Sequence, residues 1–145
     1  MFNNIIVICT GNICRSPIGE ALLRARLPAG IKRNILSAGI GALSGSPADK
    51  MATQLMLEQG IDITTHRAQQ ATLPLLSSMD LILTMDQTHS DWINRTYPQL
   101  RGRVHKIMKW QGNLDVADPY RLPRSAFEKA YTDIELGVQD WVKRL

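Results

Sequence analysis

The sequence predicts an α/β fold in which helices cover both faces of a parallel sheet. Short apolar runs that suit buried strands alternate along the chain with segments whose apolar residues recur at helical spacing. The first of these runs, IIVI at residues 5–8, has no polar alternation, as expected of a strand covered on both faces. A helix between two such strands forms a right-handed crossover, which keeps the strands parallel. We therefore expect a three-layer α/β/α domain with a parallel sheet of four strands.

The first strand is expected at about residues 4–9 and the first helix at about 17–27, where Pro28 and Gly30 end the helical spacing. A second strand is expected at about 32–38. The apolar residues of the first helix are Ile18, Ala21, Leu22 and Ala25.

A second helix is predicted to begin with Ser46 as its cap and Pro47 as its first residue, and Gly60 should end it. A short helical stretch near 71–78 and a third strand at about 80–84 follow. The apolar residues on one face of the second helix are Ala48, Met51, Ala52, Leu55 and Met56.

Asp86 can cap a helix at about 87–97, and a fourth strand fits about residues 104–108. A polar loop at about 110–123 leads to a last helix at about 124–144. One stripe of the last helix is apolar and contains Phe127, Ala130, Tyr131, Ile134, Val138 and Trp141.

Length and composition suit one domain, residues 1–145, with a single core, because 44% of the 145 residues are hydrophobic. The sequence contains no run of about 18 apolar residues that could cross a membrane. Its start lacks the basic region, apolar core and cleavage site of a signal peptide. We therefore expect a cytoplasmic protein without membrane insertion.

The chain has 17 Lys and Arg against 13 Asp and Glu, a net charge of +4. This mild excess suits an anionic substrate. The basic residues are scattered, without interleaved stacking aromatics or a recognised nucleic-acid motif. Nucleic acid is therefore not expected as a partner.

The loop between the first strand and the first helix reads CTGNICRS at residues 9–16. The carboxyl end of a parallel strand meets a helix N-terminus there, and this is a place that binds anions. Cys9 is a candidate nucleophile, and Arg15 is a two-pronged donor for two phosphate oxygens. Gly11 and Asn12 tolerate the positive φ that such a tight loop needs. A lone cysteine at a strand end could be a buried small hydrophobe, but the combination favours an anion-binding nucleophile loop.

Residues 9–17, CTGNICRSP, resemble the signature C-x-G-N-x-C-R-S-P of the low-molecular-weight protein tyrosine phosphatases. The resemblance extends over nearly the whole chain. It implies the strand order 2-1-3-4 and hydrolysis of phosphotyrosine through a phosphocysteine intermediate, without a metal or organic cofactor. Ser16 can donate its hydroxyl hydrogen to the sulfur of Cys9, or it can cap the helix. The resemblance assigns substrate binding within the loop to Thr10, Gly11, Asn12, Ile13, Cys14 and Ser16.

Hydrolysis of a phosphate ester of tyrosine needs an acid, because an unprotonated phenolate is a poor leaving group. The loop contains no carboxylate. Asp118 is the candidate, since it lies in the polar loop after the fourth strand, at the sheet edge where the nucleophile lies, and Pro119 restricts its backbone. Asp-Pro alone is a common turn, but Asp118-Pro119-Tyr120 matches the general-acid motif of the family. Asp115 is the local competitor and lacks the Pro-Tyr that follows.

The resemblance also assigns roles to residues outside the loop. Ser37 and His66 are expected to hold Asn12 in place beneath the loop, although His66 taken alone could be an ordinary surface or core histidine. Leu43 and Tyr120 are expected to form opposing walls of a slot that accepts a flat phenyl ring. Such a slot favours phosphotyrosine over the shorter phosphoserine.

Cys9 and Cys14 are the two cysteines of the chain, too few for a disulfide framework or a four-cysteine zinc site. No cluster of metal ligands is evident, so no metal site is predicted. We hypothesise that an oxidised Cys9 is trapped as a reversible disulfide with Cys14, a role that the resemblance supports. The alternative is that Cys14 only packs under the loop.

Two positions indicate a branch of the family. Arg121 stands where vertebrate members have a second tyrosine, and Leu43 is a short wall residue. Both resemble the bacterial branch associated with exopolysaccharide and capsule export, whose substrate is a tyrosine autokinase. The family often reads His-x-Ala-Arg-Gln where residues 66–70 read HRAQQ, so the ionic contact of that arginine is not expected here.

Three other functions share some of these sequence features. A thiol-dependent arsenate reductase shares the fold and loop but needs two further cysteines, and none follows Cys14. A catalytically silent phosphotyrosine-binding module would need the loop alone, and turnover distinguishes it from an enzyme. A dinucleotide-binding domain would need G-x-G-x-x-G after the first strand, which is absent.

Overall fold

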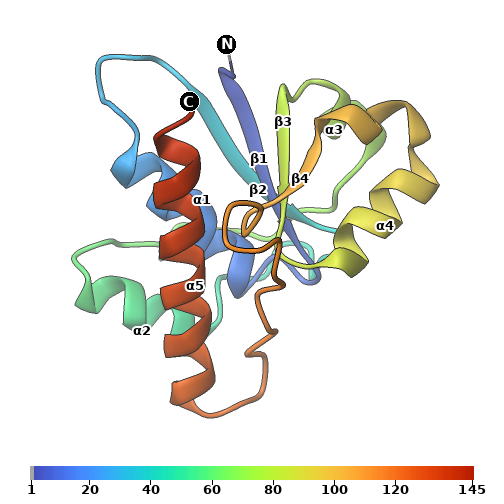
Figure 1. The fold of residues 1–145 in the computed structure, drawn as a ribbon. Coiled ribbons are helices and arrows are strands. Elements are labelled where there is room, and N and C mark those ends of the chain that lie inside the picture. The colour runs from blue at the N-terminus through green and yellow to red at the C-terminus, as the bar shows by residue number, and fades with distance from the viewer. Residues whose placement is uncertain (1) are drawn as a thin grey trace.

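The computed structural model describes residues 2–145 and contains one sheet of four parallel strands in the order β2-β1-β3-β4 (Figure 1). β1 pairs with β2 on one side and with β3 on the other, so the loop that follows β1 begins at the centre of the sheet. The α/β class and the strand order that the resemblance implied are thus confirmed. The strands are β1 (Asn4–Cys9), β2 (Asn34–Gly39), β3 (Leu81–Thr84) and β4 (Val104–Lys106).

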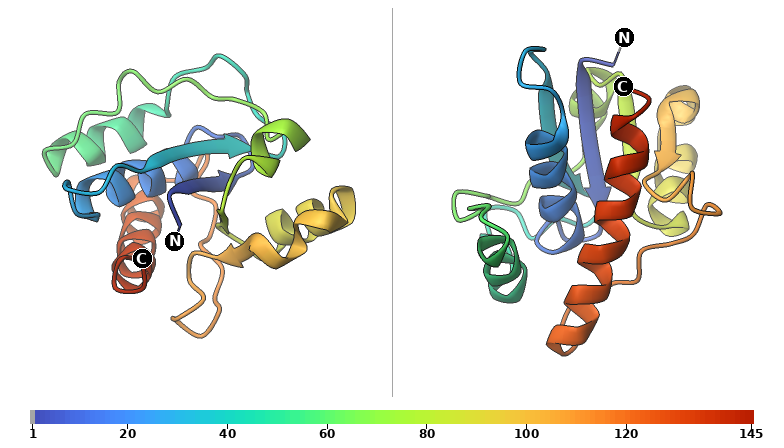
Figure 2. Two further views of the ribbon diagram at one scale, coloured as in Figure 1. Left: turned by 90° about the horizontal axis from the view of Figure 1, so that it is seen from above. Right: turned by 60° about the vertical axis from the view of Figure 1, so that its left-hand side comes forward.

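The helices form the outer two layers. α1, α2 and α5 contribute to the apolar cluster on one side of the sheet, while α3 and α4 contribute to the cluster on the other side. α1 and α5 run side by side (Figures 1 and 2). The helices are α1 (Arg15–Arg26), α2 (Lys50–Glu58), α3 (Leu73–Ser77), α4 (Gln87–Thr96) and α5 (Arg124–Val142), with a 3₁₀ helix η1 (Pro98–Arg103).

The central strand explains why the sheet is covered on both faces. Ile5 and Val7 of β1 belong to the cluster with α1 and α5, and Ile6 and Ile8 belong to the cluster with α3 and α4. All four side chains are 0% exposed. Because successive side chains of a strand point to opposite faces, an unbroken apolar run requires a core on each side.

The starts of the first two helices differ from the sequence prediction. α1 begins at Arg15, two residues before the predicted start, and Ser16 lies inside it. α2 begins at Lys50 and is capped by Asp49, whose carboxylate accepts from the N–H of Met51 at 2.8 Å. The predicted cap at Ser46 is wrong. The segment before Asp49 makes hydrogen bonds to other parts of the chain instead of helical ones. Asp49 donates its N–H to the carbonyl oxygen of Ile13, and the carbonyl oxygen of Ser46 accepts from the N–H of Ala68.

In the second half of the chain the order of helices and strands follows the prediction, but the fourth strand is shorter than predicted. Asp86 caps α4 as expected, and its side chain accepts from the N–H of Thr88. β4 ends at Lys106, two residues before the predicted end. The 3₁₀ turn before β4 was not predicted; Pro98 opens it and the buried Leu100 anchors it.

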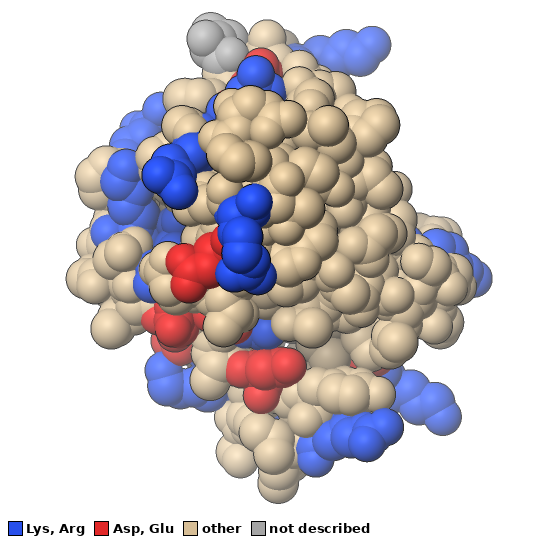
Figure 3. All heavy atoms as spheres, turned by 90° about the vertical axis from the view of Figure 1, so that its right-hand side faces the viewer, with Lys and Arg blue, Asp and Glu red and all other residues tan. Residues whose placement is uncertain are grey.

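None of the helices in residues 2–145 has the length and apolar character needed to cross a lipid bilayer. Figure 3 shows the face that lies on the right in Figure 1, where α4 is located. Its Lys and Arg side chains are scattered, one of them beside an acidic side chain near the middle, and a broad area next to these two shows no charged residue.

Gly39 at the end of β2 is required by a close approach between the sheet and the loop after β1. A Cβ atom at this position would clash with the carbonyl oxygen of Thr10 and lie 3.0 Å from the amide nitrogen of Asn12. Both obstacles are backbone atoms, which cannot move aside as the end of a flexible side chain can. The position of β2 therefore fixes the path of the loop.

We predict that Gly39→Ala lowers the free energy of unfolding by about 1–3 kcal/mol, because the added methyl group must displace the loop backbone. Gly41→Ala is the matched control, since a Cβ there meets no atom within 4 Å, and its effect should stay within about 0.5 kcal/mol. Urea denaturation of both variants measures the difference. Equal stability of the two variants would contradict this role of Gly39.

Candidate active site

The backbone of the loop between β1 and α1 is arranged to bind an anion. Carbonyl groups of the loop are turned toward the segment 40–49 and accept hydrogen bonds from it. Within residues 2–145, none of the N–H groups of residues 10–15 has a protein acceptor. Several N–H groups around one loop, next to the N-terminus of α1, form a nest for a tetrahedral oxyanion. The outward bonds are Ile40 N to Cys9 O (3.1 Å), Gly41 N to Thr10 O (3.0 Å), Leu43 N to Gly11 O (3.1 Å) and Asp49 N to Ile13 O (2.8 Å).

Asn12 holds the loop in shape. It is fully buried and has a φ of 59°, whereas Gly11, the other residue expected to tolerate positive φ, does not adopt one. The side-chain amide of Asn12 donates to Ser37 Oγ at 3.0 Å. The backbone carbonyl oxygen of Asn12 lies 2.7 Å from Nε2 of His66. The structure thus brings Ser37 and His66 to Asn12. Gln69, in the altered family motif, adds a bond from its N–H to Asn12 Oδ1 at 2.9 Å.

A directed chain of hydrogen bonds leads to the sulfur of Cys9. Asn12 Nδ2 has two hydrogens and gives them to Ser37 Oγ and to Ser16 Oγ, the latter at 2.7 Å. Ser37 donates its own hydrogen to Glu20 Oε1 at 2.6 Å. Ser16 Oγ, 2.8 Å from Cys9 Sγ, is therefore left with its hydrogen for the sulfur. The sequence left two roles open for Ser16, and the structure shows it as a donor to the sulfur of Cys9 and not as a helix cap. Glu20 is a residue of this network that sequence reasoning missed.

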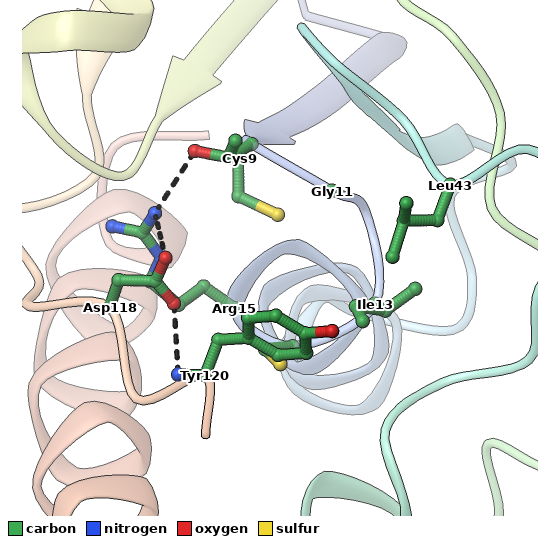
Figure 4. A pocket seen from close by; sticks show the side chains of 9 residues that line it. Cys9, Gly11, Ile13, Arg15, Leu43, Asp118 and Tyr120 are labelled. Atoms are coloured by element: carbon green, nitrogen blue, oxygen red, sulfur yellow. Dashed lines mark hydrogen bonds and ion pairs between the residues drawn. The ribbon is translucent and has the colours of Figure 1, made fainter. Parts of the chain in front are cut away.

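Arg15 is buried, with only 2% of its surface exposed, and the protein fully occupies one of its nitrogens. Nη1 donates to Asp86 Oδ2 and to the carbonyl oxygen of Val116, each at 2.7 Å. Nη2 lies 3.7 Å from Asp118 Oδ2 (Figure 4). The sequence indicated Asp86 only as a helix cap, and nothing local indicated its pairing with a residue 71 positions earlier.

Asp86 is held in its ionised form. Burial by itself would raise the pKa of its carboxyl group, but hydrogen bonds from Thr88 and Arg15, and the charge of Arg15, hold that pKa below its ordinary value. The buried guanidinium therefore has a permanent counter-charge at neutral pH.

The loop forms the base of a cavity of about 180 Å³. In Figure 4 the sulfur of Cys9 lies between the guanidinium of Arg15 on one side and Leu43 on the other, and the ring of Tyr120 lies across from them at the same pocket. Leu43 is 46% exposed and Tyr120 is 40% exposed, as suits residues at the mouth of a pocket. The lining residues are Cys9, Thr10, Gly11, Ile13, Cys14, Arg15, Leu43, Asp118 and Tyr120.

Two of the predicted binding residues are not part of the lining. Asn12 and Ser16 are 0% exposed, and their side chains lie beneath the loop and bond to one another. Within residues 2–145 no group of three His, Cys, Asp or Glu side chains is placed to hold a metal ion.

The structure separates the two candidate acids. Asp118 lines the pocket, with Oδ1 accepting from the N–H of Tyr120 at 3.1 Å. Asp115 is absent from the lining, and its Oδ1 accepts from Lys106 Nζ at 2.8 Å and from the N–H of Gln87 at 3.0 Å. Asp118 is therefore the carboxylate within reach of a ligand in the loop.

Cys14 is a second thiol in the lining, 4% exposed. Burial is the main cause that raises the pKa of the Cys14 thiol above its ordinary value, and the negative charges of Asp49, Cys9 and Asp118 act in the same direction. Cys14 is therefore a protonated thiol at neutral pH. Both cysteines are free in the structure, and the disulfide between them stays a hypothesis.

His89 of α4 lies beside Arg15 and is 0% exposed. Its Nδ1 accepts from the N–H of Asp86 at 3.1 Å, and its Nε2 lies 2.9 Å from Oγ1 of Thr10. Burial lowers the pKa of His89 from 6.5 to about 4, although the carboxylate of Asp86 opposes the shift. Sequence reasoning missed His89, because Thr10 lies 79 residues away in the chain.

Comparison with known proteins agrees with this geometry. The sequence model of the family described as low molecular weight phosphotyrosine protein phosphatase matches residues 4–145. The chain is 48% identical over 145 residues to a probable low molecular weight protein-tyrosine-phosphatase, EpsP, of Ralstonia nicotianae, with 100% of this chain and 97% of that relative covered. It is 43% identical over 145 residues to the probable phosphatase AmsI of Erwinia amylovora, with 100% and 99% covered. The solved structure of Vibrio vulnificus Wzb in complex with benzylphosphonate has a TM-score of 0.94 and 42% identity, and each chain is covered over 100% of its length.

The buried neutral His89 predicts a loss of stability in acid. Below pH 6.5 the unfolded chain takes up a proton on this residue, whereas the folded chain does so only near pH 4, so stability falls as pH falls through this window. The full effect is about 3 kcal/mol. Urea denaturation at pH 7 and pH 4.5 should show a smaller acid loss in His89→Gln than in the wild type. Identical losses in the two proteins would contradict a buried neutral histidine.

Proposed function

Because the chain belongs to the low molecular weight phosphotyrosine protein phosphatase family, we propose that Cys9, Arg15 and Asp118 carry the hydrolysis of phosphotyrosine in this protein. The family and the named relatives make the protein a cysteine-dependent protein tyrosine phosphatase. One observation above all supports the assignment of residues. The sulfur of Cys9 lies at the base of a pocket whose loop offers free N–H groups, and a guanidinium and a carboxylate flank it.

In the first step, the Cys9 thiolate attacks the phosphorus of phosphotyrosine in line with the bond to the tyrosine oxygen. The sulfur–phosphorus bond forms while the phosphorus–oxygen bond breaks, and Asp118 gives its proton to the departing oxygen. The N–H groups of the loop stabilise the charge on the other phosphate oxygens. Arg15 contributes through its Nε and Nη2 edge, since Nη1 is occupied by Asp86 and Val116.

In the second step, water hydrolyses the phosphocysteine. Asp118, now ionised, accepts a proton from the water that attacks the phosphorus. The sulfur leaves as a thiolate, and inorganic phosphate is released. The hydroxyl hydrogen of Ser16, 2.8 Å from the sulfur, stabilises the thiolate at the start of the first step and at the end of the second.

The walls of the pocket suit an aromatic phosphate ester. Leu43, Ile13 and Tyr120 are apolar or aromatic and lie around the space above the sulfur (Figure 4). A phenyl ring fits between them and holds its phosphate in the loop. A phosphoserine side chain is shorter and would have to bring the peptide backbone into the same slot.

The physiological substrate that we propose is a bacterial tyrosine autokinase of exopolysaccharide or capsule export, with phosphorylated tyrosines presented in the cytoplasm. The resemblance to the bacterial branch at Arg121 and Leu43 supports this substrate. Similarity to relatives named EpsP, AmsI and Wzb over essentially the whole chain supports it as well. Residues 1–145 would then form one catalytic domain.

The proposal is tested by phosphate release from a phosphotyrosyl and a phosphoseryl peptide in the presence of a metal chelator. The wild type should act on the phosphotyrosyl peptide selectively, and Cys9→Ser should show no turnover. Asp118→Asn should lower kcat by about 10²–10⁴-fold, because it cannot donate a proton.

Asp115→Asn is the matched control, since Asp115 pairs with Lys106 and does not line the pocket. It should keep kcat within about threefold, because its carboxylate is directed at Lys106 and Gln87 and not at the pocket. A wild type that binds the phosphotyrosyl peptide without turnover would be a recognition module and would refute the mechanism. A larger loss in Asp115→Asn than in Asp118→Asn would refute the assignment of the acid.

A further inference from the structure

The hydrogen bonds around His89 determine which ring nitrogen carries its proton. The backbone N–H of Asp86 is a donor under all conditions, and it points at Nδ1 from 3.1 Å. Nδ1 must therefore be the unprotonated acceptor, so the single hydrogen of the neutral ring is on Nε2. The pKa of about 4 keeps the ring neutral, and this tautomer in place, at physiological pH.

The tautomer in turn determines the direction of the bond to Thr10. Nε2 of His89 lies 2.9 Å from Thr10 Oγ1 and must donate to it. Nη2 of Arg15 also points at this oxygen, from 3.5 Å, and a guanidinium nitrogen can only donate. The 3.5 Å separation between Nε2 and Nη2 is consistent with two donors that share one acceptor. Both lone pairs of the hydroxyl oxygen are thereby directed toward these donors.

We propose that the Thr10 hydroxyl donates its hydrogen to a phosphate oxygen in the loop, and that His89 is the positioning residue that orients it. Because His89 and Arg15 both donate to the hydroxyl oxygen, neither can accept the hydroxyl hydrogen, and Thr10 lines the pocket in which a phosphate would bind. The inference rests on the proposed function of the site and adds a side-chain donor to the backbone N–H groups of the loop.

Asp86 links the position of the Thr10 hydroxyl to that of Arg15. Its carboxylate holds Nη1 of Arg15 at 2.7 Å, while its backbone N–H holds His89. Because one residue, the N-cap of α4, positions both, the guanidinium and the hydroxyl keep a fixed spacing. Two donors with a fixed spacing can bind two oxygens of the same phosphate without a further loss of conformational freedom.

The direct test is the affinity of the protein for inorganic phosphate, measured by calorimetry at pH 7. Thr10→Val keeps the shape of the side chain and removes the hydroxyl, so the dissociation constant should rise about tenfold. Thr10→Ser restores a hydroxyl and should bind within about twofold of the wild type. Unchanged affinity in Thr10→Val would overturn the inference.

A double-mutant cycle tests the positioning role of His89. His89→Asn offers an acceptor to the N–H of Asp86 but does not reach Thr10, so phosphate affinity should fall about as far as in Thr10→Val. The Thr10→Val/His89→Asn protein should show little further loss, because both changes remove the same donor. Losses that add in full would mean that His89 only supports the fold, and they would overturn its positioning role.

Two further readouts separate the alternatives. If the hydroxyl donated to the sulfur of Cys9 instead, Thr10→Val would change the pH dependence of Cys9 alkylation by iodoacetamide and leave phosphate affinity unchanged, which would refute the inference. Phosphate binding requires no turnover. A wild type that binds phosphate in this manner without hydrolysing phosphotyrosine would refute the proposed function and leave the inference standing.

Discussion

The ion pair between Arg15 and Asp86 is the interaction on which the site depends. A guanidinium that is 2% exposed must keep a counter-charge, and Asp86 provides it at 2.7 Å. Arg15 opens α1 after the central strand, and Asp86 caps α4 after β3. Because these strands are parallel neighbours, their carboxyl ends bring the two charges together. Val116, in the loop after β4, adds its carbonyl oxygen to the same guanidinium nitrogen, so three segments converge on one side chain.

The residues around this ion pair form two groups, one beneath the loop and one that lines the cavity above it. Beneath the loop, the side-chain amide of Asn12 donates two hydrogen bonds, one to Ser37, which donates in turn to Glu20, and one to Ser16, whose hydroxyl faces the sulfur of Cys9. Groups above the loop line the cavity and are the ones that we propose to contact the substrate. The carbonyl oxygens of the loop are bonded to the segment 40–49, which leaves its N–H groups for an anion. The proposed phosphate site thus depends on backbone direction as much as on side chains.

The sequence indicates local features well and distant contacts poorly. The strand β1, the cap at Asp86 and the tight turn between β1 and α1 depend on neighbouring residues and are predictable from the sequence. The strand order was available only through family resemblance, because hydrophobic periodicity does not specify which strands pair. Ser46-Pro47 carries a helix-start signal, yet tertiary bonds of that segment move the start to Lys50. The contacts of Glu20 and His89 join residues that are 17 and 79 positions apart, and no local pattern indicates them.

The most direct test of this account is to find where the phosphorus is bound during turnover. A rapid quench of the Asp118→Asn protein mixed with p-nitrophenyl phosphate, followed by mass spectrometry, reports the modified residue. The account predicts phosphate on the sulfur of Cys9, because this acidic phenol leaves without the proton of Asp118, whereas the second step lacks its base and the intermediate accumulates. Phosphate on another residue, or release of phosphate from a protein without a reactive cysteine, would contradict it.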